Sequence, residues 1–371
     1  MLNNLTVNNY KCLVECSLEL KPLNLFAGPN SSGKSTALQA LLIASDNVTE
    51  QKGKHGLKNR RTEASNFNDV RNFVTNAKSY EICISYHGED PTRLCFTPGD
   101  DSFQTTFVEQ SADASPNLLG VLGSENLLYL PATRPGGAYM HPVNPDSENK
   151  LGRNGEFVID YYAKHRLDTL DAALILAPGT QTLEGQVNYQ LDRLTGYRLV
   201  VETVGSNHYV KYETRSGKQL LPYHVGTGVS FMTEVIIACF ATPKGGMVIT
   251  ENPEIHLHPK AQADLIDFMA KIAKAGVQII IESHSDHLFN GIRRLISQEK
   301  LALSDVAVYN FRQDGNGLTH AEPVEFTPQG GIQSYIPGMF EQFDIDFISR
   351  VALNANAPFI LSITLFLSDN S

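Results

Sequence analysis

The 371-residue sequence lacks the features of a secreted, membrane-spanning or disulfide-stabilised protein. Its five cysteines form an odd set without a CxxC pair, which argues against a disulfide framework or a cysteine metal loop. The N-terminal stretch MLNNLTVNNYKCLVECSLEL alternates polar and apolar residues and has no continuous apolar segment of a signal peptide. The best apolar run, APFILSITLFL near the end, is too short to cross a bilayer. We therefore expect a cytoplasmic protein that does not use a membrane.

An excess of positive charge is also missing. The formal net charge is -10, from 30 Lys and Arg against 40 Asp and Glu. A protein that coats nucleic acid over its whole surface needs clustered basic residues, so this class is excluded. One local cluster remains in KGKHGLKNRR, and it predicts either a solvated loop tip or a contact with DNA or RNA phosphates. The cluster consists of Lys52, Lys54, Lys58, Arg60 and Arg61.

The chain has no internal repeat and no low-complexity segment, and its 42% apolar residues are enough for a proper core. Short strands are predicted within residues 2–26 and 51–108. Further along, GMVITENPE and GVQIIIESHSD are typical of buried strands, and the amphipathic helix PKAQADLIDFMAKIAKAG separates them. Buried strands that alternate with helices indicate an α/β protein with a mainly parallel sheet.

The segment GPNSSGKST matches the phosphate-loop pattern G-x-x-x-x-G-K-[ST]. It follows the predicted strand LNLFA and opens the predicted helix KSTALQALLIAS, which is the context that this motif requires. Glycines allow the backbone N–H groups to point inward as an anion nest at a helix N-terminus. Lys34 is expected to reach the β and γ phosphates, and the Ser35 hydroxyl to bind Mg²⁺. The predicted nucleotide-binding residues are Gly28, Pro29, Asn30, Ser31, Ser32, Gly33, Lys34, Ser35 and Thr36.

Taken together, NNYKCL, GPNSSGKST, VGTGVSFMTEVIIACF, ENPEIHLHP and IIIESHSDHL resemble the ABC-type branch of the P-loop ATPases. The sequence is most similar to bacterial AAA ATPases of the OLD-like and SMC-like class, whose genes often stand beside effectors in anti-phage operons. The resemblance implies an ABC-type ATPase head over residues 1–346, with a mainly parallel core sheet and an N-terminal antiparallel β subdomain. It also implies an inserted helical and β segment at about 136–222. Residues 347–371 would form a tail, for which a docking strand is one interpretation.

In proteins of this class, two heads close head to tail around two ATP molecules, so the resemblance implies a homodimer or a higher oligomer. Each site then takes a signature helix from the other chain. Here the signature would be GTGVS, with Gly226 and Gly228 allowing close approach and Ser230 opening the helix toward the γ-phosphate. The alternative is an ordinary glycine-rich turn before a core helix.

The same resemblance makes Glu251 the Walker B acid, which holds Mg²⁺ directly or through water. His256 and His258 would lie in the D-loop, and His284 would be the switch histidine near the γ-phosphate. An alternative is a zinc site formed by these three histidines and His287, because HxH and HxxH are plausible ligand spacings.

Asn252 stands where this class usually has its catalytic glutamate, and an amide cannot accept a proton as a carboxylate does. Three interpretations are open. Glu254 would supply the base if the loop turns back, or Asn252 would only orient the attacking water. Alternatively, the protein would be a slow switch that holds ATP for a long time. Phosphoryl transfer depends chiefly on positioning and charge stabilisation, so we predict slow but real hydrolysis.

The leading hypothesis is an ATPase that uses Mg-ATP to gate an associated effector, a nuclease or toxin, in anti-phage defence. One alternative is a DNA repair or chromosome-maintenance ATPase that acts directly on DNA through residues 52–61. A second alternative is a scaffold that binds ATP and never hydrolyses it, for which Asn252 is the argument.

Overall fold

The computed structural model describes residues 1–49, 66–99, 106–111, 113–123, 125–145, 150–152 and 155–333. These residues belong to one unit, Met1–Ser334. The basic cluster at 52–61, the boundary at 346 and the tail at 347–371 lie outside the described residues, so those interpretations stay predictions. Among the helices of the described residues, none has the length and apolar character needed to span a bilayer.

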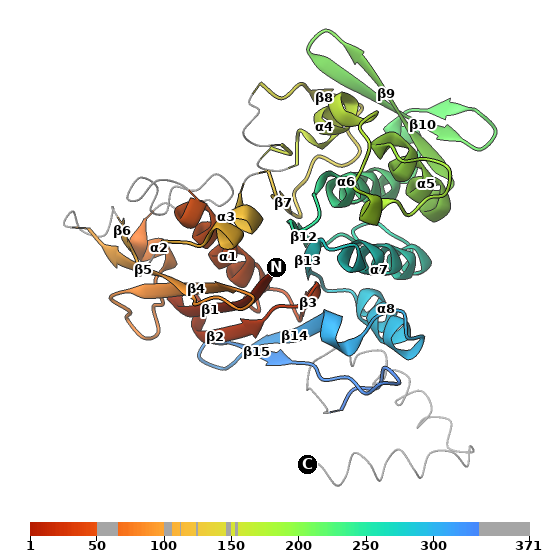
Figure 1. Ribbon diagram of the computed structural model, residues 1–371. Coiled ribbons are helices and arrows are strands. Elements are labelled where there is room, and N and C mark those ends of the chain that lie inside the picture. The colour runs from red at the N-terminus through yellow and green to blue at the C-terminus, as the bar shows by residue number, and fades with distance from the viewer. Residues whose placement is uncertain are drawn as a thin grey trace, which may run out of the picture. The chain divides into compact units, whose positions relative to one another are not determined.

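A six-stranded sheet forms the centre of the fold, in the order β15-β14-β3-β13-β12-β7 (Figure 1). The five strands from β14 to β7 in this order are parallel, and β15 pairs antiparallel with β14 at the edge. Strands β3 and β13 are buried along their whole length, as expected for strands covered on both faces. The bounds are β3 Leu23–Ala27, β7 Leu127–Leu130, β12 Met247–Glu251, β13 Gln278–Glu282, β14 Val306–Gln313 and β15 Thr319–Pro323.

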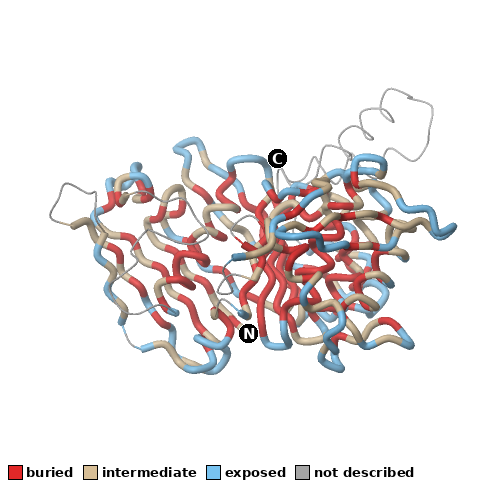
Figure 2. Tube along the Cα trace, turned by 90° about the horizontal axis from the view of Figure 1, so that it is seen from above, coloured by how far each residue is buried: buried red, intermediate tan, exposed pale blue. Residues whose placement is uncertain are grey.

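Helices cover both faces of the central sheet, so the predicted mainly parallel α/β core is confirmed (Figure 1). Helix α1 lies on one face and shares a core with the N-terminal strands, whereas α6, α7 and α8 cover the other face. Figure 2 shows that the buried residues concentrate along this central sheet and its neighbours. The helices span α1 Lys34–Thr49, α6 Thr227–Ala241, α7 Pro259–Lys274 and α8 Asp286–Ser297, and the 3-10 turn η3 spans Leu303–Asp305.

The N-terminal residues form an antiparallel five-stranded sheet in the order β2-β1-β4-β5-β6, which confirms the predicted antiparallel β subdomain. Burial alternates along strands such as β5, because one face packs on the core and the other faces solvent. The elements are β1 Leu2–Tyr10, β2 Leu13–Glu19, α2 Phe67–Val70, β4 Tyr80–Tyr86, β5 Thr92–Pro98, β6 Thr106–Gln110 and α3 Pro116–Leu122.

Between β7 and α6 the chain forms the helical and β insert that the resemblance implied. Its helices pack on α6 and α7, and its four strands form a separate antiparallel sheet (Figure 1). A buried hydrogen bond of 2.8 Å between His208 Nε2 and Asp160 Oδ1 ties the β9–β10 hairpin to α4. The elements are β8 Met140–Pro142, α4 Val158–His165, η1 Ala172–Leu174, α5 Leu183–Thr195, β9 Tyr197–Val204, β10 Asn207–Thr214, β11 Gln219–Leu220 and η2 Pro222–His224.

The parallel register brings three chain segments to one edge of the central sheet. Glu251 at the end of β12 pairs with Glu282 at the end of β13, and Glu282 in turn pairs with Phe26 near the end of β3. The loop after β3 is the phosphate-loop motif. The fold therefore places this motif beside two carboxylates from neighbouring strands.

Candidate functional site

The phosphate loop connects β3 to α1, and its two motif glycines have backbone conformations that other residues rarely adopt. Gly28 has φ +134° and Gly33 has φ +99°. A Cβ on Gly28 would lie 2.2 Å from the carbonyl oxygen of Phe311, and a Cβ on Gly33 would lie 2.4 Å from Thr319 Oγ1. Glycine is thus required at both positions because strands β14 and β15 pack directly against the loop and leave no room for a side chain.

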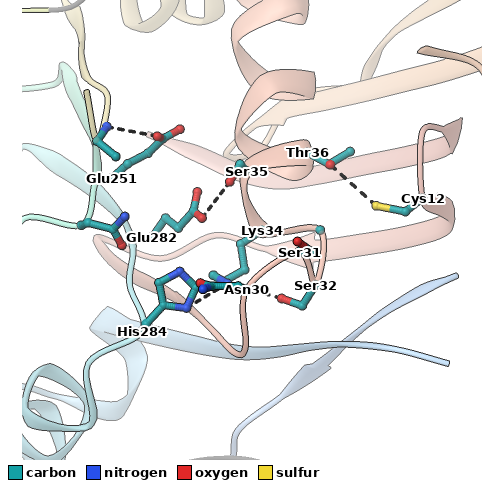
Figure 3. A pocket seen from close by; sticks show the side chains of 13 residues that line it. Cys12, Asn30, Ser31, Ser32, Lys34, Ser35, Thr36, Glu251, Glu282 and His284 are labelled. Carbon is teal, nitrogen blue, oxygen red and sulfur yellow. Dashed lines mark hydrogen bonds between the residues drawn. The ribbon is translucent and has the colours of Figure 1, made fainter. Parts of the chain in front are cut away.

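A cavity of about 360 Å³ opens over this loop (Figure 3). Seven of the nine predicted nucleotide-binding residues line it, and Gly28 and Pro29 instead present carbonyl groups to Lys34. Residues from β12 and β13 form the opposite wall. The lining consists of Cys12, Asn30, Ser31, Ser32, Gly33, Lys34, Ser35, Thr36, Ala132, Glu251, Asn252, Glu282 and His284.

Lys34 is almost entirely buried in the loop, with 2% of its surface exposed. Its Nζ donates hydrogen bonds to the carbonyl oxygens of Gly28 at 3.0 Å and Pro29 at 2.7 Å. Burial lowers the pKa of the ammonium group, and the nearby Glu282 carboxylate counteracts this shift. A buried cation in a glycine-containing loop at a helix N-terminus is suited to an anionic phosphate.

His284 follows β13 and points toward the phosphate loop, as the sequence predicted (Figure 3). Its Nδ1 lies 2.8 Å from the Gly28 carbonyl oxygen, which only accepts, and 3.5 Å from Lys34 Nζ, which only donates, and the shorter contact favours a proton on Nδ1. Burial and then the Lys34 charge lower the pKa of the ring, which favours the neutral form. Nε2 is then an acceptor that can bind a water or hydroxyl hydrogen.

The carboxylates of Glu251 and Glu282 lie at the edge of the central sheet that borders the cavity. The hydroxyl of Tyr129 donates to Glu251 Oε1 at 2.9 Å, and the Ala132 N–H donates to Oε2 at 3.2 Å. The hydroxyl of Ser35 donates to Glu282 Oε1 at 2.8 Å. Burial, followed by the charge of Glu251, raises the pKa of Glu282 to about 7.

Glu282 is a site residue that sequence reasoning missed. The available signal was that both predicted buried strands, GMVITE and GVQIIIE, end on glutamate. Carboxyl ends of parallel neighbours meet at the same sheet edge, so the two acids would have been expected to lie together.

Asn252 has a structural explanation that the sequence did not reveal. Its φ is +43°, in the left-handed region that Asn tolerates better than other residues with a Cβ. Its N–H donates to the Glu282 carbonyl oxygen at 2.8 Å, and its own carbonyl accepts from Arg134 Nη2 at 3.0 Å. Asn at this position therefore fits the turn after β12, whatever its part in catalysis.

We expect Asn252→Gly to keep the free energy of unfolding within about 1 kcal/mol of the wild type, because glycine accepts a positive φ. Asn252→Glu should lose about 1–2 kcal/mol, since a longer side chain in this conformation is strained. Urea denaturation measures both values. Asn290→Glu, at an exposed position of α8, is the matched control and should change stability little. Equal stability of Asn252→Glu and Asn252→Gly would refute this explanation.

Glu254 does not line the cavity. Its Oε1 accepts a hydrogen bond from the Ser283 hydroxyl, and burial raises the pKa of its carboxyl. The structure therefore gives no support to the interpretation in which Glu254 turns back to replace the missing base.

The segment predicted to be the signature lies at the start of α6, but one detail of the sequence interpretation was wrong. The helix begins at Thr227 with Gly226 as its N-cap, so Ser230 does not open it. Ser230 is buried one turn inside, whereas Gly226 and Thr227 are exposed. The expected close approach occurs within the chain, because a Cβ on Gly228 would lie 2.5 Å from the His256 carbonyl oxygen.

The two predicted D-loop histidines occupy the turn between β12 and α7. His256 has φ +61°, and its ring centroid lies 5.4 Å from that of Phe231. His258 is the N-cap of α7, where its side chain accepts from the Lys260 N–H. Among the described residues, no three His, Cys, Asp or Glu side chains are grouped so as to hold a metal, so the zinc alternative has no support.

Arg134 is a second residue that the sequence analysis missed, and it organises the turn after β12. Its Nη1 donates to the Glu251 carbonyl oxygen at 2.8 Å, and its Nη2 to that of Asn252. Its Nε lies 3.6 Å from Glu234 Oε2 on α6, and its guanidinium lies over the Phe231 ring at 5.1 Å. Burial raises the pKa of Glu234 to about 7, although Arg134 opposes the shift. One buried arginine thus joins the turn after β12 to helix α6.

Comparisons with known proteins agree with this architecture. The model described as "AAA ATPase domain" matches residues 1–131, and the model described as "AAA domain, putative AbiEii toxin, Type IV TA system" matches residues 142–290. The chain is 24% identical over 332 residues to the OLD nuclease of Thermus scotoductus (strain ATCC 700910 / SA-01). That match covers 77% of this chain and 59% of the nuclease, so the chain spans less than two thirds of its relative.

Solved structures show the same fold at low sequence identity. An SmcHead bound to the C-winged helix domain of ScpA superposes with a TM-score of 0.57 at 12% identity, over 87% of this chain and 97% of that one. The Smc head domain with an extended coiled coil, bound to the C-terminal domain of ScpA derived from Pyrococcus furiosus, gives 0.53 at 12% identity. Its match covers 87% of this chain and 96% of the other.

Proposed function

Because the chain is an ABC-type AAA ATPase of the OLD-like and SMC-like class, we propose that it binds Mg-ATP, dimerises around it and hydrolyses it slowly to control an effector. The observation that carries this proposal is the cavity in which a phosphate loop faces the carboxylates of Glu251 and Glu282.

The residues around the cavity fit Mg²⁺ as well as ATP. Hydroxyl and carboxylate oxygens are the ligands that this ion prefers, and Ser35 and Glu251 offer them beside the loop. When bound, the ion would neutralise charge on the phosphates. Lys34 would bind phosphate oxygens, and the loop N–H groups from residue 31 onward would bind the remainder.

We expect slow ATP hydrolysis because the residues beside the attacking water are poor proton acceptors. The neutral His284 offers Nε2 as an acceptor that orients water, but its lowered pKa makes it a weak base. The Asn252 amide can orient water without accepting a proton. Positioning and charge stabilisation therefore provide most of the acceleration that we propose.

The dimer part of the proposal is supported by the start of α6. Gly226 and Thr227 are exposed, and the helix start has no side-chain cap, so it can present N–H groups to a phosphate from another chain, although the Val229 N–H already donates to the Gly226 carbonyl. The contact between Gly228 and the His256 carbonyl joins this helix start to the D-loop turn of the same chain.

A charge reversal at the helix start tests the dimer. Thr227→Glu should fold normally, since an acidic residue in the first helical turn is favourable. It should bind a fluorescent ATP analogue as the wild type does, yet form ATP-dependent dimers at least about tenfold more weakly, because the carboxylate repels the phosphates. Sedimentation velocity with and without Mg-ATP measures the dimer, and Thr227→Ser is the matched control. Equal ATP-dependent dimerisation of Thr227→Glu and wild type would contradict the arrangement.

The effector is proposed from the relatives. The similar protein is named a nuclease, and the second matching model names a toxin of a toxin–antitoxin system. We therefore propose that the ATPase controls a nuclease or toxin in anti-phage defence, in the cytoplasm. Direct action on DNA through residues 52–61 is the alternative, and it predicts DNA-stimulated hydrolysis.

A further inference from the structure

Glu251 and Glu282 stand side by side as the last residues of two parallel neighbouring strands. Both line the cavity, and Figure 3 shows Glu282 pointing toward Ser35 of the phosphate loop. The chain thus brings a second acid into the cavity, from another strand than the one on which the family resemblance led us to expect it.

The environment of Glu282 distinguishes it from an ordinary buried acid. The residue is 5% exposed, and its Oε1 accepts the hydrogen bond from the Ser35 hydroxyl at 2.8 Å. Its other oxygen, Oε2, is buried and has no hydrogen-bond partner. A buried carboxylate oxygen without a partner is costly unless a cation or a donor compensates it.

The hydrogen bond from Ser35 to Glu282 also determines whether the Ser35 hydroxyl oxygen can bind a cation. A serine hydroxyl has one hydrogen and two lone pairs. Because Glu282 accepts the hydrogen, the lone pairs of Ser35 remain for a cation. Ser35, Glu251 and the free oxygen of Glu282 then form a set of hard oxygen ligands.

Mg²⁺ is the ion that such a set fits. In nucleotide sites it is commonly bound by one or two carboxylates, with phosphate oxygens and water completing its octahedral coordination. The described residues contain no group of three or more His, Cys, Asp or Glu that would hold a metal by itself, which agrees with a site that needs the nucleotide.

We propose that Glu282 is a metal-site residue of this chain, which orients Ser35 and offers its second oxygen to the Mg²⁺ that accompanies ATP. This inference rests on the proposed Mg-ATP binding. It assigns the second acid of the site to the strand before His284, rather than to the residue after Glu251.

The test measures how much Mg²⁺ strengthens nucleotide binding, with a fluorescent ATP analogue titrated in EDTA and in Mg²⁺. Glu282→Gln keeps the size of the side chain and can still accept from Ser35. We expect it to reduce the Mg²⁺-dependent gain in affinity by about tenfold or more. In EDTA the variant should bind the analogue as tightly as the wild type or more tightly, because a negative charge near the phosphates is gone.

A merely structural role for Glu282 would weaken binding equally in both buffers, and that result would overturn the inference. Asp160→Asn removes a different buried carboxylate, in the insert, and is the matched control that should keep the full gain. The double variant of Ser35→Ala with Glu282→Gln should lose little more than the larger single loss, since the two residues act as one unit. If the wild type failed to bind the analogue in either buffer, the proposed function would fail together with the inference.

Discussion

Lys34→Ala should lower steady-state phosphate release from Mg-ATP by about a hundredfold or more, the cost of removing one buried group that stabilises charge on the transferred phosphate. Lys34 is 2% exposed, and its ammonium group lies at the centre of the phosphate loop. Other residues of the cavity cannot replace it, because Asn30 and Ser32 carry no charge. Phosphate release by purified protein, measured with a coupled colorimetric assay, gives the ratio.

Lys150→Ala provides the control for this experiment. Lys150 is another largely buried lysine, but it contacts Glu125 and does not line the cavity. Its replacement should leave phosphate release unchanged. Equal release from Lys34→Ala and wild type would mean that the measured activity does not come from this site.

The same assay separates the rival functions. ATP binding without release above the Lys34→Ala background would support the non-hydrolysing scaffold. Release that rises on addition of DNA would support the DNA-maintenance alternative. For the defence proposal, cells that carry the chain with its neighbouring genes should resist phage, and Lys34→Ala should remove that resistance.

Arg134→Met is expected to lower the free energy of unfolding by about 3–5 kcal/mol, the usual result of removing one partner from a buried charge pair. The variant loses the donors to the Glu251 and Asn252 carbonyl groups, and it leaves Glu234 buried without its cation. Methionine fills a similar volume, so the loss reports polar contacts rather than a cavity. Urea denaturation measures the change.

Two further variants separate the contributions of charge and geometry. Arg134→Lys keeps the charge but not the planar fork, so we expect an intermediate loss. The double variant of Arg134→Met with Glu234→Leu should recover part of the stability, because no charge is then left unpaired. A loss below about 1 kcal/mol for Arg134→Met would show that this arginine does not hold the turn.

Much of the fold followed from patterns that act locally. The strand, glycine loop and helix around Lys34 are specified by a short motif. The strands β12 and β13 are specified by continuous apolar runs. The short N-terminal strands were predicted from their residues, whereas their antiparallel sheet was implied by the family resemblance. These patterns can be recognised in the sequence because each involves only residues that are close together along the chain.

The missed residues depend on contacts between distant segments. Arg134 donates to a carbonyl 117 positions away, and nothing near it in the sequence indicates that partner. Glu282 becomes a site residue only through the register of β13 beside β12. The start of α6 was placed one turn too late because Gly228 resembles a turn residue, whereas its real constraint is the His256 carbonyl packed against it.

The contacts of the phosphate loop with β14 and β15 can form only late in protein synthesis. Gly28 packs against the carbonyl of Phe311, and Thr319 Oγ1 donates to the Ser32 carbonyl across 287 positions of the chain. A ribosome makes the loop sequence early and the strands that brace it late, since synthesis runs from the N-terminus. The emerging N-terminal segment therefore lacks the contacts that brace the loop, and we expect nucleotide binding to begin only when translation has passed β15.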